Sequence, residues 1–313
     1  MPNQSRKIPS KPDILAVTPG DPEGIGPEII AKSLGRYTPG LPMVIVGQRR
    51  LFPSGIEATT IESLDEVGGR GAFLLETPVE PGQDPSFAWV RRAVDLALDG
   101  RVKGIVTGPI GKHQWWRAGI PFAGHTGYLA ERAKASRYAM FFWAEDLKVA
   151  LFTTHQPLRE IFASIRRDRI VDFIAFIDSE LKRLFGHEFR FFVCGLNPHA
   201  GEDGLLGDEE KNDIAPALEE LKGKVDIAGL FSADVIFPKA RKTENSVVVA
   251  WYHDQGLIPF KQLHFRDGVN LTLGLPFVRT SPDHGPARDI AGQGIADSTS
   301  MLSAIQLAEN LVS

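Results

Sequence analysis

The chain has 313 residues and a formal net charge of −4, with 43% hydrophobic and 24% charged residues. This balance is ordinary for a globular protein with sizeable cores, and the lack of a basic cluster argues against a nucleic-acid partner. No apolar run approaches the ~18 residues of a membrane span, and the polar N-terminus lacks the apolar centre of a secretory signal, so we expect a cytoplasmic protein without membrane contacts.

Apolar runs that end in Gly or Pro alternate with amphipathic segments along the whole chain. This alternation predicts βαβ units and an α/β fold with a largely parallel sheet. Residues 54–84 give no clear pattern, and Cys194 is expected to be a buried apolar residue. Strands and their loops are expected at 13–20, 42–48, 103–112, 138–155 (two strands around a turn), 189–199, 226–237, 246–256 and 268–281, and helices at 26–36, 86–102, 126–136, 165–186, 207–223 and 299–312.

Three histidines follow apolar strands in the same way. His155 ends "ALFTTH", His199 ends "FVCGLNPH", and His253 follows "SVVVAWY". Imidazole nitrogens suit Zn²⁺, Co²⁺ and related divalent ions, and three protein ligands leave room for a substrate. Because scattered histidines are a weak signal, three unrelated loop residues remain the alternative.

Two glycine-rich strings could bind an anion. "TPGDPEGIGPE" precedes a helix, whose free amides attract negative charge, and "TGPIGK" adds the ammonium of Lys112. Neither string matches a dinucleotide fingerprint or a P-loop. An ordinary strand-to-helix turn explains the first string equally well.

Polar residues elsewhere suit a substrate site. His125 and Thr126 open a helix in "GHT", although Thr126 could serve only as its N-cap. Lys261, Asn270 and Arg279 could hold a carboxylate or phosphate, with Arg binding in a bidentate manner, although each could also be a surface residue.

The string "SPDHGPARDIAGQGIAD" could hold a dinucleotide. The glycines Gly285 and Gly292 would let backbone amides approach a pyrophosphate, and Asp289 could bind a ribose hydroxyl. A plain Gly/Pro-rich connection is the other interpretation.

Taken together, "GDPEGIGPE", "GHT", "TTHQPL", "GLNPHAGEDGLLGDEE", "SAD", "YHDQGLIPFK" and "VNLTLGLPFVRTSPDHGPARDIAG" resemble the 4-hydroxythreonine-4-phosphate dehydrogenase family of pyridoxal phosphate biosynthesis. The resemblance runs from about residue 14 to near the C-terminus. It implies two α/β/α domains with the active site in the cleft between them. We expect residues 1–124 and 285–313 to form the first domain and residues 125–284 the second.

The resemblance also implies the roles of individual residues. His155, His199 and His253 would bind a divalent metal such as zinc, cobalt or magnesium, with His253 contributed by the partner in a homodimer with shared active sites. Substrate binding would involve His125, Thr126, Lys261, Asn270 and Arg279, catalysis Asp234 and His125, and binding of NAD or NADP Gly285, Asp289 and Gly292.

The implied reaction is NAD-dependent, metal-dependent oxidation and decarboxylation of 4-phosphooxy-L-threonine to 3-amino-2-oxopropyl phosphate. One departure bears on the substrate: the family usually has "GHTE", and here Gly127 replaces that Glu. A related dehydrogenase for 4-phospho-threonate, 4-phospho-erythronate or an aromatic cis-dihydrodiol acid is therefore the alternative. A catalytically idle binding protein on the same scaffold is a third possibility, against which the three intact histidines argue.

Overall fold

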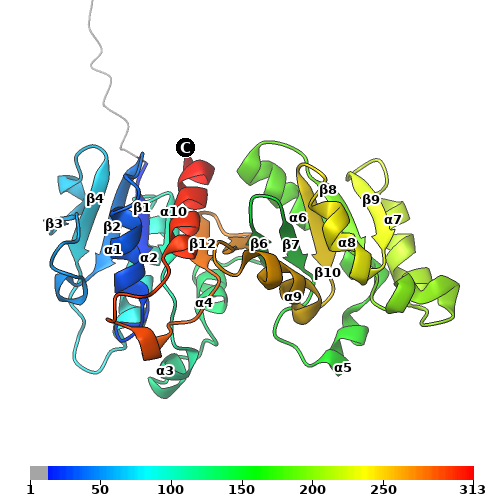
Figure 1. The fold of residues 1–313 in the computed structure, drawn as a ribbon, viewed down its shortest axis with the longest axis horizontal. Coiled ribbons are helices and arrows are strands. Elements are labelled where there is room, and N and C mark those ends of the chain that lie inside the picture. The colour runs from blue at the N-terminus through cyan, green and yellow to red at the C-terminus, as the bar shows by residue number, and fades with distance from the viewer. Residues whose placement is uncertain (1–12) are drawn as a thin grey trace, which may run out of the picture.

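Within residues 13–313, twelve strands form one continuous sheet in the order β3-β4-β2-β1-β5-β12-β11-β6-β7-β10-β8-β9, with helices packed against it (Figure 1). The computed structural model describes residues 13–313, so the expectation that the N-terminus carries no secretory signal falls largely outside the described residues. The strands are β1 (Leu15–Thr18), β2 (Pro42–Gly47), β3 (Thr59–Ile61), β4 (Gly71–Glu76), β5 (Gly104–Thr107), β6 (Ala139–Trp143), β7 (Lys148–Leu151), β8 (Arg190–Cys194), β9 (Ile227–Phe231), β10 (Ser246–Ala250), β11 (Val269–Leu273) and β12 (Val278–Pro282).

The helices follow the strands in the alternation that the sequence predicts. Two short segments after β8 also matter below: the turn η4 (Pro198–Gly204) and the π-helical turn η5 (Glu210–Ile214). The α-helices are α1 (Gly26–Leu34), α2 (Pro85–Leu98), α3 (Lys112–Arg117), α4 (His125–Arg132), α5 (Leu158–Ile161), α6 (Arg167–Phe185), α7 (Ala215–Leu221), α8 (Ala233–Ala240), α9 (His253–His264) and α10 (Thr299–Val312). None of the described helices is both long and apolar enough to cross a membrane.

The sheet is largely parallel, which confirms the predicted fold class. Within the described residues only the centre departs from this, because β11 is antiparallel to both β12 and β6, and β6 is antiparallel to β7. Because of these reversals, β5 and β7 run in opposite directions, and in a flat sheet their carboxyl ends would lie at opposite edges. Each strand is rotated by about 20–25° relative to its neighbour, and these rotations add up across the strands between β5 and β7. Figure 1 shows α3 and α5, which follow β5 and β7, at the same end of the molecule.

Helices cover both faces of the N-terminal half of the sheet. Successive residues of a strand point to opposite faces. Ala16 and Val44 accordingly join the core beneath α2, whereas Leu15 and Met43 join the core formed with α1 and α10. The C-terminal helix therefore completes a layer begun by N-terminal residues, and Figure 1 shows α10 beside α1 and β12.

A single large core holds the other half together. The helix α6 buries a stripe spaced by three or four residues, Ile170, Ile174, Ile177 and Leu181, against the strands. The predicted division at 124/125 and 284/285 stays a prediction. The buried Tyr128 of α4 shares the core beneath α2 with residues of the N-terminal segment.

Two segments fold differently from the sequence-based expectation. Residues 138–155 do form the expected hairpin, β6 and β7. Residues 226–237 and 246–256, however, are expected as strands and loops, and they contain the first part of α8 and the start of α9. Gly256 and Pro259 give α9 the composition of a loop. Gly256 is needed because a Cβ there would lie 2.7 Å from Cδ2 of Leu151, so glycine lets α9 pack closely on β7.

Candidate functional site

A pocket of about 1030 Å³ lies between residues that follow β5 and β12 and residues that follow β7 and β10. It brings together eight of the residues predicted from the sequence: His125, Thr126, His155, His253, Lys261, Asn270, Arg279 and Gly285. Four other predicted residues are not among those lining it: His199, Asp234, Asp289 and Gly292.

The three candidate metal ligands follow neighbouring parallel strands. The strand order β7-β10-β8 places His155, His253 and His199 at one edge of the sheet. The rings of His155 and His253 lie with their centroids 5.7 Å apart, but the exposed His199 is not with them. No group of three metal-binding side chains comes together within residues 13–313.

His155 has a suitable protonation state for metal binding. Burial, the Lys112 ammonium and the neighbouring His253 all lower the pKa of His155, which keeps its imidazole neutral. His253 lies beside His155 in the same chain, and the expectation that a partner subunit supplies His253 stays a prediction. His199 is the histidine that stands apart.

Arg279 is a buried cation that pairs with no carboxylate of residues 13–313. Its side chain is 3% exposed, and the guanidinium donates to the hydroxyls of Thr272 (3.1 Å) and Thr107 (2.7 Å). Its Nε has no hydrogen-bond partner in the part of the chain that the structure describes, and burial lowers the pKa of the guanidinium to about 10. A buried charge without a counter-charge is unfavourable, so this position favours an anionic ligand in the pocket.

His125 lies close to Arg279 and is also incompletely bonded. It is the first residue of α4, it packs edge-on against Trp115, and its buried Nε2 has no partner. Burial, Arg279 and Lys112 hold the pKa of His125 well below its usual range, so it is neutral. Thr126 is not an N-cap, because Gly124 occupies that position. The buried Oδ1 of Asn270 is a further acceptor without a partner.

The pocket carries more positive than negative charge. Among the described residues, its only lining carboxylate is Asp283, which pairs with Lys261 at 3.4 Å. Burial raises the pKa of the Asp283 carboxyl although Lys261 lowers it. Lys112 and Arg169 also line the pocket and form no ion pair within the described residues. The string "TGPIGK" predicts a role for Lys112 in anion binding. Nothing in the sequence distinguishes Arg169 from the other charged residues of α6.

The glycine-rich strings near the two ends of the chain pack against each other. Arg288 makes a bidentate ion pair with the buried Asp21 (2.7 and 3.0 Å), and the amide of Ile25 donates to Pro286. "GDPEGIGPE" is thus a structural turn that supports the 285–292 segment. Gly285 reaches the pocket, whereas Asp289 and Gly292 lie outside its lining.

Asp234 lines a second hollow, between α8 and α9. This hollow is mainly apolar and includes Phe237, Tyr252 and Ile258. Val235 and Ile258 on these helices are more than half exposed, as is Phe265 directly after α9. The predicted catalytic residues Asp234 and His125 are therefore not brought together within one chain.

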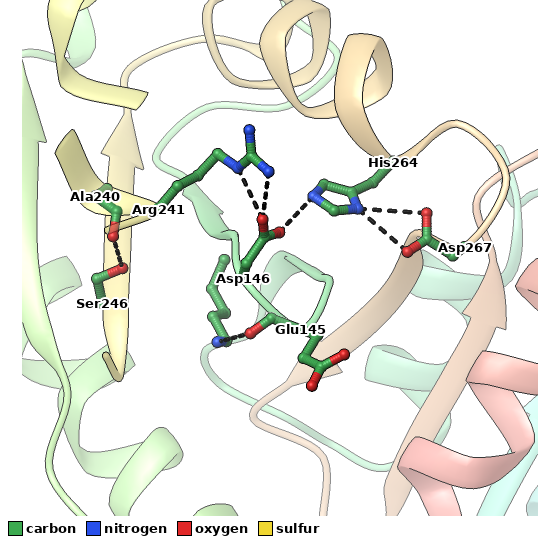
Figure 2. A network of polar contacts seen from close by, with 8 residues as sticks. Glu145, Asp146, Ala240, Arg241, Ser246, His264 and Asp267 are labelled. Carbon is green, nitrogen blue, oxygen red and sulfur yellow. Dashed lines mark hydrogen bonds and ion pairs between the residues drawn. The ribbon is translucent and has the colours of Figure 1, made fainter. Parts of the chain in front are cut away.

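A polar network fixes the far end of α9 (Figure 2). The carboxylate of Asp146, in the turn between β6 and β7, lies between Arg241 and His264, and His264 also contacts Asp267. Burial alone would raise the pKa of Asp146, but Arg241 and His264 lower it overall. The network ties α9, which carries His253 and Lys261, to the hairpin strand that leads to His155.

Comparisons with known proteins agree over nearly the whole chain. The family model described as pyridoxal phosphate biosynthetic protein PdxA matches residues 58–308. A 4-hydroxythreonine-4-phosphate dehydrogenase of Aquifex aeolicus is 40% identical, covering 95% of this chain and 98% of the relative. A D-threonate 4-phosphate dehydrogenase of Pectobacterium atrosepticum is also 40% identical, covering 95% and 99%. The solved structure of a 4-hydroxythreonine-4-phosphate dehydrogenase from Klebsiella pneumoniae is 40% identical, with a TM-score of 0.84 over 97% of this chain and 99% of that one.

Proposed function

The chain belongs to the pyridoxal phosphate biosynthetic protein PdxA family, and from this premise we propose that it is an NAD(P)-dependent, metal-dependent dehydrogenase of a small phosphorylated hydroxy acid. The proposed reaction is oxidation and decarboxylation of 4-phosphooxy-L-threonine to 3-amino-2-oxopropyl phosphate in pyridoxal phosphate biosynthesis. Names of relatives that are 40% identical over nearly their full length support the oxidoreductase role.

The buried guanidinium of Arg279 is the observation that carries the proposal. A phosphate or carboxylate would supply the counter-charge that the folded chain lacks, with charge-assisted hydrogen bonds from Arg279. Lys112 and Lys261 on the pocket wall would add further positive charge. Neutral His125 and the amide of Asn270 offer unpaired hydrogen-bonding atoms that would orient the hydroxyl groups of the substrate.

The donor set suits a divalent metal held between two copies of the chain. His155 and His253 would supply two imidazole ligands, and His199 of a second copy would supply the third. When bound, such an ion polarises the hydroxyl group that is oxidised and lowers its pKa. The exposed apolar residues of α8 and α9 support a homodimer, since they lie on the same half of the molecule as His199.

The nicotinamide cofactor is proposed to bind along the 285–292 segment. Gly285 lines the pocket, and the Asp21–Arg288 ion pair fixes the segment against the first strand-to-helix turn. When bound in its oxidised form, a nicotinamide would supply the hydride acceptor for oxidation of the carbon that carries the hydroxyl group. Gly292 and Asp289 would then hold the outer part of the dinucleotide, where amides and a carboxylate suit pyrophosphate and ribose.

A second candidate substrate is the corresponding acid without an amino group, such as 4-phospho-threonate. Gly127 lines the pocket, and nothing lies within 4 Å of the position that its Cβ would take. The only lining carboxylate, Asp283, is already paired with Lys261. The pocket therefore offers several cations for acid groups and no free carboxylate for a substrate ammonium.

Turnover by the metal-loaded protein tests these proposals. Formation of NADH or NADPH would be followed with Zn²⁺, Co²⁺ or Mg²⁺ and a panel containing 4-phosphooxy-L-threonine, 4-phospho-threonate, 4-phospho-erythronate and an aromatic cis-dihydrodiol acid. Reduction with a phosphorylated acid is expected. Reduction only with the dihydrodiol would contradict the phosphate assignment, and binding of phosphorylated acids without any reduction would indicate an idle binding protein.

A further inference from the structure

The turn after β8 has an unusual backbone. Five successive residues, from His199 to Asp203, lie in the left-handed region, with φ between 43° and 79°. Only Gly201 among them lacks a side chain, and the other four adopt a conformation that is unfavourable for L-residues. Such a run persists only where surrounding contacts fix it.

Glu210 supplies those contacts. Its side chain is nearly buried, and one carboxylate oxygen accepts from the backbone amides of Leu196 (2.8 Å) and Asn197 (2.7 Å). The other oxygen accepts from Nδ2 of Asn197 (2.9 Å), which also donates to Glu209 (2.7 Å). No Lys or Arg of the described residues pairs with Glu210. Its negative charge is therefore stabilised by N–H groups of the backbone and of the Asn197 side chain, between the end of β8 and the start of η4.

The turn is shaped to close over this carboxylate. A Cβ on Gly201 would lie 2.7 Å from Oε2 of Glu210, so only glycine allows the backbone to approach so closely. The amide of Leu206 donates back to the carbonyl of Gly201 (3.1 Å). The outer side of the turn leaves His199, Leu205 and Leu206 exposed. The acidic and glycine-rich residues after "NPH" therefore build an internal anchor.

We propose that Glu210 is a positioning residue: it fixes the left-handed turn and thereby holds the exposed imidazole of His199 ready to complete the metal site of a second copy. This inference rests on the proposed function, because it takes His199 to be a metal ligand. Groups that orient a ligand contribute to metal affinity although they never touch the ion.

Cobalt titration of the full-length, metal-free protein tests the role of Glu210. Glu210→Gln keeps the side-chain size but replaces one acceptor oxygen by an NH₂ group that faces N–H donors. We expect it to weaken Co²⁺ binding about 10- to 100-fold and to speed amide hydrogen exchange in residues 199–207. The matched control is Glu219→Gln on α7, where an exposed carboxylate pairs only with Lys222, and it should change neither measurement.

A second variant covers the case in which Glu210→Gln does not fold. Asn197→Ala removes the side-chain amide on the other side of the same contact and should produce both effects more weakly. Unchanged Co²⁺ affinity in a folded variant, or weaker affinity with unchanged exchange in the turn, would overturn the inference. Failure of the unaltered protein to bind Co²⁺ would instead overturn the proposed metal site itself. In that case, unchanged amide hydrogen exchange in residues 199–207 of the Glu210→Gln variant would also reject the anchoring role of Glu210.

Discussion

His155 and His253 lie side by side within one chain, with ring centroids 5.7 Å apart and planes inclined at 40°. They follow the neighbouring parallel strands β7 and β10, whose pairing fixes the separation. His199 follows β8, on the other side of β10, and stands outside the pocket. The arrangement predicts which subunit supplies each ligand.

Mixtures of inactive variants test that assignment. If His199 comes from the second copy, mixing His199→Ala with His253→Ala gives mixed dimers with one complete site and one lacking both residues. Statistical exchange should then restore about one quarter of the activity. Mixing His155→Ala with His253→Ala should restore none, because neither site is complete. Recovery in the second mixture, after verified subunit exchange, would contradict the pairing.

Replacement of Arg279 separates binding from stability. Arg279→Met removes a buried cation without a counter-charge, so the ligand-free protein should be as stable as the original or more stable. The loss of a charge-assisted hydrogen bond, about 1.5–3 kcal/mol, should weaken phosphate binding about 10- to 150-fold. Thermal unfolding with and without inorganic phosphate measures both effects, with the exposed Arg190→Met as control. A strongly destabilised variant with unchanged phosphate binding would indicate a purely structural arginine.

Gly127 offers a test of substrate choice. A Glu side chain has room there, and it lies in the first turn of α4, where an acidic residue is favourable. Gly127→Glu should raise kcat/KM for 4-phosphooxy-L-threonine relative to 4-phospho-threonate by about 10- to 150-fold, the worth of one charge-assisted bond to an ammonium. Gly127→Gln controls for size without charge. An unchanged ratio in the folded Glu variant would show that Gly127 is not close to the substrate amino group.

The buried His125 predicts a pH-dependent stability. Burial, Arg279 and Lys112 hold its folded pKa well below the ordinary value of 6.5. The unfolded state therefore binds protons first, so stability is fully present above about pH 6.5 and is lost as the pH falls below it. Urea unfolding at about pH 7.5 and about pH 5.5 should show the loss. His155, whose pKa is also lowered, will contribute to it. His125→Asn should reduce the loss, whereas exposed His187→Asn should not.

The sequence alone determined the fold class and most of the candidate site. Alternating apolar runs and amphipathic helices predict a parallel α/β sheet because side-chain burial follows the periods of strand and helix. His155, which follows one of those strands, could be selected because parallel strands bring their carboxyl ends together. His125, at the start of α4, and Arg279, within β12, were selected by side-chain chemistry and by the family resemblance.

Tertiary structure decided how those residues are grouped. Neither the proximity of His155 and His253 nor the separation of His199 is encoded in local pattern, because strand order is set by long-range packing. The helix α9 was missed because Gly256 satisfies a close contact with β7 that only the folded chain creates. The unpaired state of Arg279 likewise depends on which side chains packing places around it, and that environment is what makes an otherwise ordinary arginine a candidate anion site.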